Sequence, residues 1–293
     1  MSSYRLPPQT HIGLAHLRVS DLDRALSFYR DRVGFREARR NGATAVLSAS
    51  GGAPAHLVLE ALPGARPRPP RTTGLYHVAI RLPTRAALAQ VVRRLAGGGW
   101  PFQGAADHGV SEAFYLADPD GNGLELYVDR PREQWAWSGD QVAMVTEPLD
   151  VEGLLAEAGE ADDGLLDPGA DIGHVHLSVS NLAQAEAFYA DLLGLDVTQR
   201  TYPGALFLAA GGYHHHLGTN TWAGSGAIPP PPDAVGLAAF ELRLPDRAAW
   251  EALVERVRVA GYMPDPAPSY GVTDAVLLHD PDQIGVLITA SAG

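Results

Sequence analysis

The chain has 293 residues, of which 46% are hydrophobic, so it is long enough for one large or two ordinary domains with a real core. Its formal net charge of -12 argues against a nucleic-acid or anionic-membrane partner, because both reward clustered Lys and Arg. The absence of cysteine excludes disulfides, thiol nucleophiles and Cys-ligated metals, so any metal must be bound by His and carboxylate.

The N-terminal segment, MSSYRLPPQTHIG, lacks an apolar stretch of signal-peptide length. No run anywhere in the chain approaches the roughly 18 apolar residues of a membrane-spanning helix. We therefore expect a cytoplasmic protein without a membrane partner.

An internal repeat organises the chain. The segment 12–35, IGLAHLRVSDLDRALSFYRDRVGF, aligns without gaps with IGHVHLSVSNLAQAEAFYADLLGL at 172–195. A second pair begins at 74 with GLYHVAIRLPTRAALAQ and at 236 with GLAAFELRLPDRAAWEA, and DPDGNG at 118 matches DPDQIG at 280. The chain therefore contains four related modules, at 12–62 and 74–130 within residues 1–130, and at 172–222 and 236–293 within residues 172–293.

Each module begins with an alternation typical of a strand and continues with apolar residues at helical spacing. Asp21, Thr84, Asn181 and Asp246 stand where the four helices should begin, as N-cap residues do. Gly-rich turns and short apolar runs after each helix indicate about three more strands. The modules are thus predicted to be βαβββ units of an α+β protein.

The pieces between the modules are predicted to be mostly irregular. The stretches 63–74 and 223–236 are too rich in Pro and Gly for regular structure, so we expect loops there. The segment 131–171 connects the two halves, and PLDVEGLLAEAG inside it predicts a short helix.

Four modules of this kind resemble the vicinal oxygen chelate superfamily, in which two modules pair their sheets into a cup around a metal. The resemblance covers nearly the whole chain and implies two cup-shaped antiparallel half-barrels of the glyoxalase-like fold. Members of the superfamily include isomerases, dioxygenases, antibiotic-resistance transferases and metal-free binding proteins. The fold alone therefore does not name the chemistry.

The resemblance implies that a module supplies one metal ligand from its first strand and one from its last strand. His77 and Glu125 occupy these positions in the second module, and His174 the first-strand position in the third. The counterpart positions in the first and fourth modules hold Leu14, Ala239 and Leu287. The pattern implies one metal site, formed by pairing the second module with the third or, alternatively, by contact of His174 with a second subunit.

Two imidazoles and one carboxylate leave one face of a metal ion open, which is the arrangement used for Fe(II) oxygen chemistry. Fe(II) is therefore the expected cofactor, with Mn(II) as a substitute. His16 and His176 share another repeat position, two residues after the ligand position. Because His16 lies in a module without ligands, we expect both of these histidines to be structural.

The stretch DHGVSEAFYLADPDGNGLELY, at 107–127, resembles the signature of extradiol ring-cleaving dioxygenases. The resemblance implies that Glu125 is an iron ligand and that His108 and Tyr115 lie near the bound substrate and oxygen. One departure from the pattern is Ala106, where Gly, Asn, Thr, Ile or Val is usual.

A second resemblance to the extradiol enzymes is a pair of His residues followed by one residue and then an aliphatic one. In those enzymes the second His of the pair is the acid/base. In GGYHHHLGTNTWAG, at 211–224, this match makes His215 the acid/base, with Leu217 as the aliphatic position. We expect His214 and His216 to project to the opposite face of a strand from His215.

The resemblance as a whole implies a catechol 2,3-dioxygenase that inserts both atoms of O2 into a catechol-type substrate. A glyoxalase-like isomerase, a fosfomycin-type transferase and a metal-independent sequestering protein are alternatives within the same superfamily. For an isomerase, the resemblance implies a site of four ligands that include two carboxylates. The ligand positions mapped here supply only one carboxylate, Glu125. The ring substituents of the substrate and a homo-oligomeric state are left open.

Overall fold

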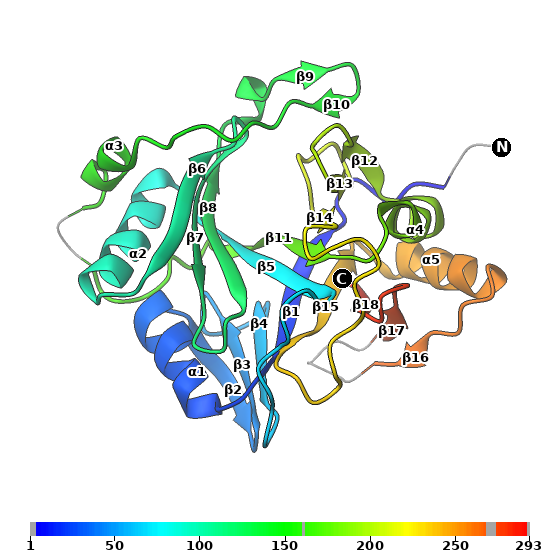
Figure 1. Ribbon diagram of the computed structural model, residues 1–293, viewed down its shortest axis with the longest axis horizontal. Coiled ribbons are helices and arrows are strands. Elements are labelled where there is room, and N and C mark those ends of the chain that lie inside the picture. Colours follow the sequence, from blue (N-terminus) through cyan, green and yellow to red (C-terminus); the bar gives the residue numbers. More distant parts are fainter. Residues whose placement is uncertain (1–3, 160–161, 268–273, 292–293) are drawn as a thin grey trace.

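The computed structural model describes residues 4–159, 162–267 and 274–291 of the chain, so parts of the fourth module, at 268–273 and 292–293, lie outside the described residues. Four copies of a strand, a helix and three further strands follow one another along the chain (Figure 1). This confirms the predicted α+β fold of βαβββ modules. No helix in the described ranges combines the length and the apolar character needed to cross a membrane.

The first half contains two modules. The elements of the first are β1 (His11–Val19), α1 (Leu22–Phe28), the π-helical turn η1 (Tyr29–Val33), β2 (Arg36–Asn41), β3 (Thr44–Ser48) and β4 (Leu57–Ala61). Those of the second are β5 (Gly74–Arg81), α2 (Arg85–Gly97), β6 (Phe102–Asp107), β7 (Ser111–Ala117) and β8 (Gly123–Asp129).

The connecting segment and the second half follow. The connection carries η2 (Arg132–Gln134), the small hairpin β9 (Trp137–Ser138) and β10 (Gln141–Val142), and the predicted short helix as α3 (Val151–Ala156). The third module has β11 (Asp171–Ser178), α4 (Leu182–Glu186), η3 (Ala187–Leu192), β12 (Asp196–Gln199), β13 (Ala205–Ala209) and β14 (Leu217–Asn220). The fourth has β15 (Gly236–Leu244), α5 (Arg247–Val259), β16 (Asp265–Pro266), β17 (Ala275–His279) and β18 (Gly285–Ala290).

The helices begin where the sequence indicated. Asp21, Thr84, Asn181 and Asp246 are the N-cap residues of α1, α2, α4 and α5, and each side chain accepts a hydrogen bond from a backbone N–H in the first turn. These bonds satisfy amides that have no partner inside the helix.

Two 8-stranded sheets are built from strands of different halves. One has the order β16-β17-β18-β15-β1-β4-β3-β2, and the other has the order β12-β13-β14-β11-β5-β8-β7-β6. The first module is therefore joined to the fourth through the antiparallel pair β1 and β15, and the second to the third through β5 and β11. Within each module the first and last strands are parallel, so the sheets are mixed rather than wholly antiparallel.

A buried hydrogen bond is repeated where successive modules meet. The Tyr29 hydroxyl donates to Asp118 Oδ2 at 2.9 Å, and the Tyr189 hydroxyl donates to Asp280 Oδ2 at 2.8 Å. Both tyrosines are fully buried in the hydrophobic core, and both aspartates lie in the DPD turns. Burial raises the pKa of Asp280 to about 6, in spite of the hydrogen bonds from Ile284 and Tyr189 that oppose it.

Replacing either tyrosine with phenylalanine should lower the free energy of unfolding by about 1–3 kcal/mol, because a buried carboxylate loses a donor. The matched control is Tyr262→Phe, at an exposed position, which should be close to neutral. Chemical denaturation measures both. Losses under 0.5 kcal/mol for Tyr29→Phe and Tyr189→Phe would contradict this account.

The effect of Tyr189→Phe should also depend on pH. A folded-state pKa of about 6 lies above the usual Asp value, so the folded protein takes up a proton before the unfolded chain does as the pH falls. Once Asp280 is neutral, the lost donor costs less. Denaturation should therefore show a larger loss of stability at pH 8 than at pH 5, and equal losses would refute this.

Candidate functional site

Three adjacent strands bring His77, Glu125 and His174 together. In the order β11-β5-β8, Ala79 of the central strand is paired with His174 on one side and with Glu125 on the other. His77 lies two residues before Ala79 and therefore faces the same side of the sheet. The small side chain of Ala79 leaves the space between the three larger ones open.

The β5–β11 pairing shifts register around Gly173, between Ile172 and His174. A Cβ atom at Gly173 would lie 1.7 Å from the Tyr127 hydroxyl, so any larger residue at this position would force the buried Tyr127 side chain to move. Such irregularities re-aim the neighbouring side chains of a strand. The same shift occurs between Ile12 and Ala15 in the other sheet, so it belongs to the fold and not to the site alone.

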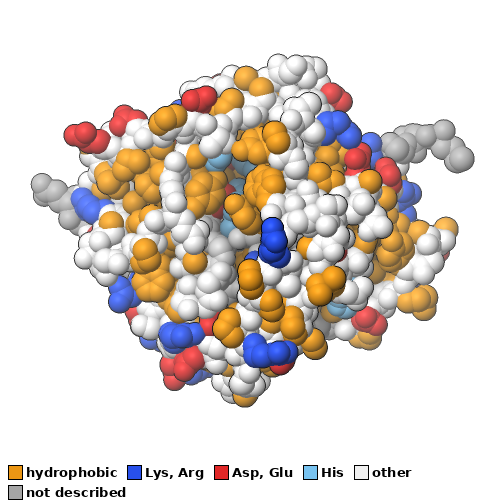
Figure 2. Space-filling view, in the orientation of Figure 1, with side chains coloured by type: hydrophobic (Ala, Val, Ile, Leu, Met, Phe, Trp, Pro, Cys, Tyr) orange, Lys and Arg blue, Asp and Glu red, His pale blue; other side chains and the backbone are white. Residues whose placement is uncertain are grey.

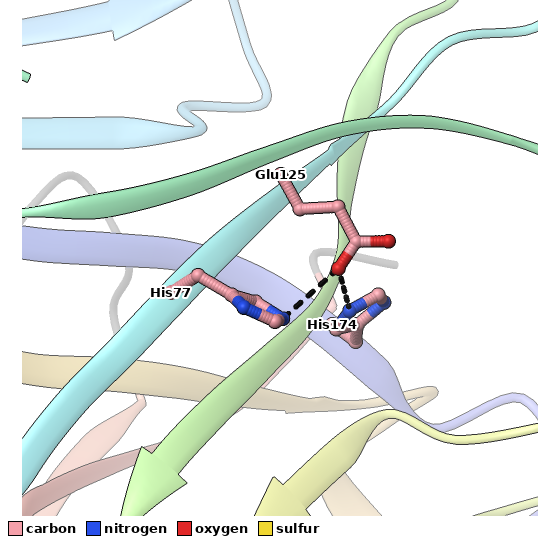
Figure 3. Close-up of side chains that lie close together, drawn as sticks. All are labelled: His77, Glu125 and His174. Carbon is pink, nitrogen blue, oxygen red and sulfur yellow. Dashed lines mark hydrogen bonds and ion pairs between the residues drawn. The ribbon is translucent and has the colours of Figure 1, made fainter. Parts of the chain in front are cut away.

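The polar atoms of the three residues converge on one point. His77 Nε2 lies 2.9 Å and His174 Nε2 3.1 Å from the same oxygen of Glu125, and one ligand atom from each residue lies within 4.8 Å of the others (Figure 3). All three side chains are buried. His77 Nε2, although close to Glu125, has no hydrogen-bond partner of suitable geometry among the described residues. A buried polar atom in this state fits a cation better than it fits a protein hydrogen bond.

Burial and charge set the protonation of this group. Burial alone would raise the pKa of Glu125, but His174 and His77 hold it well below its usual range, so the carboxylate is ionised. Burial lowers the pKa of His174 to about 4 against the opposing pull of Glu125, so its imidazole is neutral at physiological pH. An ionised carboxylate with a neutral imidazole is the form in which these groups bind metals.

The described residues of the other sheet form no such group. Leu14, the repeat counterpart of His174, packs with Val46 and Val58 in a small apolar cluster. Across the residues that the structure describes, His77, Glu125 and His174 form the single cluster of His, Asp and Glu side chains with metal-binding geometry. The predicted ligand residues therefore meet in one place, between the second and third modules.

A cavity with a volume of about 200 Å³ lies beside these residues. Its polar lining includes His77, His108, Tyr115, Glu125 and His215, and its apolar lining includes Val110, Met144, Val145, Phe207 and Trp222. The connecting segment thus supplies part of the wall, at Met144 and Val145. Histidine side chains are visible in a recess among hydrophobic ones near the centre of the face shown in Figure 2.

His108 and Tyr115 are hydrogen-bonded to each other at the cavity wall. His108 Nδ1 lies 2.7 Å from the Val145 carbonyl oxygen, which can only accept, so Nδ1 carries the proton. In the neutral ring Nε2 then accepts from the Tyr115 hydroxyl, at 2.7 Å. Tyr115 is also paired with Glu125 across β7 and β8, and burial together with the charge of Glu125 raises the pKa of its hydroxyl well above the usual value.

The three consecutive histidines differ from the expectation of a strand. They lie in the turn that precedes β14, and His214 contacts His215 instead of facing away from it. His215 lines the cavity, whereas His216 Nδ1 accepts from the backbone N–H of Ala210. The repeat counterpart of His216, His56, accepts in the same way from Ala49, so this contact serves the fold.

The interpretation of His176 as a purely structural residue does not account for its position. His176 also lines the cavity, and its Nε2 is buried without a hydrogen-bond partner in the described part of the chain. Its counterpart His16 lies 3.0 Å from Glu60. The repeat counterpart of Glu60 is Asn220, on the strand next to that of His176, so the exchange of Glu60 for Asn220 is the sequence signal that distinguishes His176 from His16.

Known proteins resemble the chain in sequence and in fold. A catechol-2,3-dioxygenase of Bacillus subtilis (strain 168) is 44% identical over 272 residues, which are 91% of this chain and 94% of that protein. Among solved structures, a candidate dioxygenase from Bacillus subtilis subsp. subtilis matches with a TM-score of 0.67, at 14% identity over 99% of this chain and 87% of that chain. Glyoxalase I from Zea mays matches with a TM-score of 0.58, at 19% identity over 96% and 92%.

The two structural matches support the fold alone, because their sequence identities are low. The family model described as Glyoxalase/Bleomycin resistance protein/Dioxygenase superfamily matches twice, at residues 10–126 and 171–288, so each match covers one whole module and most of the next. With most of its length matched, the chain belongs to the Glyoxalase/Bleomycin resistance protein/Dioxygenase superfamily.

Proposed function

We propose that the protein is an extradiol dioxygenase, which cleaves the ring of a catechol beside its two hydroxyls and incorporates both atoms of O2. The observation that carries this proposal is the convergence of His77, Glu125 and His174 at the wall of a cavity that also holds His108, Tyr115 and His215. The 44% identity to a catechol-2,3-dioxygenase supports it independently.

His77, Glu125 and His174 would hold the metal, for which we propose Fe(II), with Mn(II) as a substitute. A metal ion held by three protein ligands supplies open positions at which a catechol and O2 can both bind and exchange electron density. The single carboxylate in the described cluster also distinguishes this donor set from the two-carboxylate site of the isomerase alternative.

His215 is the proposed acid/base. It lines the cavity, and burial lowers its pKa well below the usual value, so the imidazole is neutral and can accept a proton from a substrate hydroxyl. The same nitrogen can return the proton later in the reaction. Its neighbours His214 and His216 are engaged elsewhere, which favours His215 among the three.

Tyr115 and His108 are the proposed groups that hold the oxygen atoms of the substrates. The bond from His108 Nδ1 to the Val145 carbonyl fixes the ring, and the Tyr115 hydroxyl is placed beside Glu125 at the cavity wall. Tyr115 can turn its hydroxyl proton from His108 Nε2 to a substrate oxygen, where it would stabilise charge that develops during the reaction, and His108 Nε2 is then free to accept a hydrogen bond from a substrate hydroxyl. The apolar part of the lining keeps water away from this region.

The protein should bind one Fe(II) or Mn(II) per chain, measured by calorimetry or by metal analysis after dialysis. His77→Ala, Glu125→Gln and His174→Ala should each weaken binding by at least about 100-fold, since loss of an outer hydrogen-bond partner alone costs 10–100-fold. The matched control is His279→Ala, at an exposed position on β17, which should bind normally. Unchanged affinity in the first three variants would rule out this site.

Anaerobic loading with Fe(II), followed by catechol and then air, should give oxygen uptake together with the yellow absorbance of a ring-fission product. His174→Ala should abolish both signals, because the metal is no longer held against the substrate cavity. Metal binding without oxygen uptake, across a panel of substituted catechols, would instead favour an isomerase, a transferase or a sequestering protein.

The cavity should favour catechols with uncharged substituents. No Arg or Lys is present in its described lining, and none occurs among the residues outside the described ranges. A carboxylate on the ring would therefore be desolvated without a cation to pair with. We expect kcat/KM for a carboxylated catechol to be at least about 10-fold below that for its methyl ester. Equal values in steady-state assays would contradict this.

A further inference from the structure

His215 is the last member of a chain of hydrogen bonds that begins at Asp129, the final residue of β8. His214 Nε2 lies 2.8 Å from Asp129 Oδ1, and His214 Nδ1 lies 2.8 Å from His215 Nδ1. His214 is fully buried between the two. Asp129 is thus connected to the cavity through one imidazole, although it does not line the cavity itself.

The Asp129 carboxylate is held in place by other groups. The Tyr213 hydroxyl donates to it at 2.9 Å, and Arg81 lies 3.2 Å from Oδ2. Burial would raise the pKa of Asp129, but its bonds to His214, Arg81 and Tyr213 outweigh burial and lower it. The carboxylate is therefore ionised and can only accept hydrogen bonds.

The direction of the hydrogen bonds follows from this end of the chain. Because Asp129 only accepts, His214 Nε2 must carry a proton. In a neutral His214 ring, Nδ1 is then without a proton and accepts from His215 Nδ1. That assignment places the proton of His215 on Nδ1 and leaves its Nε2 free to accept one.

The counterpart positions in the other sheet lack this arrangement. The repeat counterparts of Asp129, His214 and His215 are Ser291, Pro54 and Ala55. The counterpart of His216, by contrast, is again a histidine with the same backbone contact. The hydrogen-bonded chain therefore accompanies the metal-binding cluster and is not needed to build a module.

We propose that Asp129 and His214 are positioning residues that fix His215 in the tautomer whose Nε2 accepts the substrate proton. The proposal rests on the proposed function, since it concerns the acid/base of that reaction. It corresponds physically to the Asp of a Ser-His-Asp triad, which holds its histidine in the required tautomer; there the change to Asn keeps the geometry and lowers kcat about 10⁴-fold.

Kinetics of three variants of the full-length, Fe(II)-loaded protein test the proposal. Asp129→Asn should lower kcat by about 10²–10⁴-fold with KM changed less than about 3-fold. His214→Gln removes the acceptor for His215 Nδ1 and should lower kcat similarly. His214→Asn places a carboxamide oxygen near the former Nδ1 position, so its kcat should lie between those of His214→Gln and the wild type. Asp233→Asn, an exposed Asp paired with Arg66, is the matched control.

Nitrogen NMR of the metal-free protein, labelled with ¹⁵N-histidine, gives a readout that does not depend on turnover. The His215 signal, assigned by its absence in His215→Gln, should show a proton on Nδ1 in the wild type and on Nε2 in Asp129→Asn. If the wild type cleaves no catechol, the proposed function fails, and this spectrum alone decides the tautomer assignment.

Three results would overturn the inference. One is a wild-type His215 signal with the proton on Nε2. Another is a kcat in Asp129→Asn and His214→Gln within about 3-fold of the wild type. The third is a loss of metal affinity in those variants as large as the loss of kcat, because that would show a structural role only.

Discussion

The antiparallel pairing of β5 with β11 is the constraint on which the site depends. It places a first strand of the second module beside a first strand of the third, and β8 completes the group of three strands. Ligand atoms that are far apart in the sequence then lie around the small side chain of Ala79. The same pairing brings Asp129, at the end of β8, close to the turn before β14 that carries His214.

The charges in this region are consistent with that placement. One ionised carboxylate, Glu125, lies between two imidazoles, and a second, Asp129, lies behind the histidines of the turn. Burial acts to raise the pKa of both carboxyls, fully for Glu125 and in part for Asp129, and both stay charged because the specific partners of each lower its pKa by more. The site therefore combines charged carboxylates with an apolar cavity lining. Because an apolar lining screens charges less than water does, electrostatic interactions inside the cavity are strengthened.

Comparison of the repeats made the ligand positions and the helix starts predictable from the sequence. The positions of His77, Glu125 and His174 stood out because their counterparts are apolar, and the N-cap residues defined the helix starts. The contacts of His214, His215 and His216 could not be obtained in this way, because they lie in a turn, where no periodicity fixes the direction of a side chain. Asp129 gave no signal of its own, since its partner is 85 residues away in the sequence.

The DPDG part of the extradiol-like stretch has a second role that the sequence did not reveal. Asp118 and Asp120 accept hydrogen bonds from the Tyr29 hydroxyl and the Ser20 backbone N–H of the preceding module, and Asp280 and Asp282 accept them in the same way from Tyr189 and Ser180. Because the fourth module keeps these contacts although it supplies no predicted ligand, the Asp-Pro element serves to join modules, and the proposed chemistry rests on the residues around it.

The crossed pairing of modules has a consequence for synthesis of the chain. While the first half is emerging from the ribosome, β5 has β8 and β1 has β4, but the other edge of each strand has no neighbour until β11 and β15 are made. Unpaired strand edges are templates for association with other chains. The boundary between the repeated halves is therefore not a boundary between folding units, because each sheet contains strands of both halves. A fragment cut there would expose both open strand edges and lack part of the candidate site.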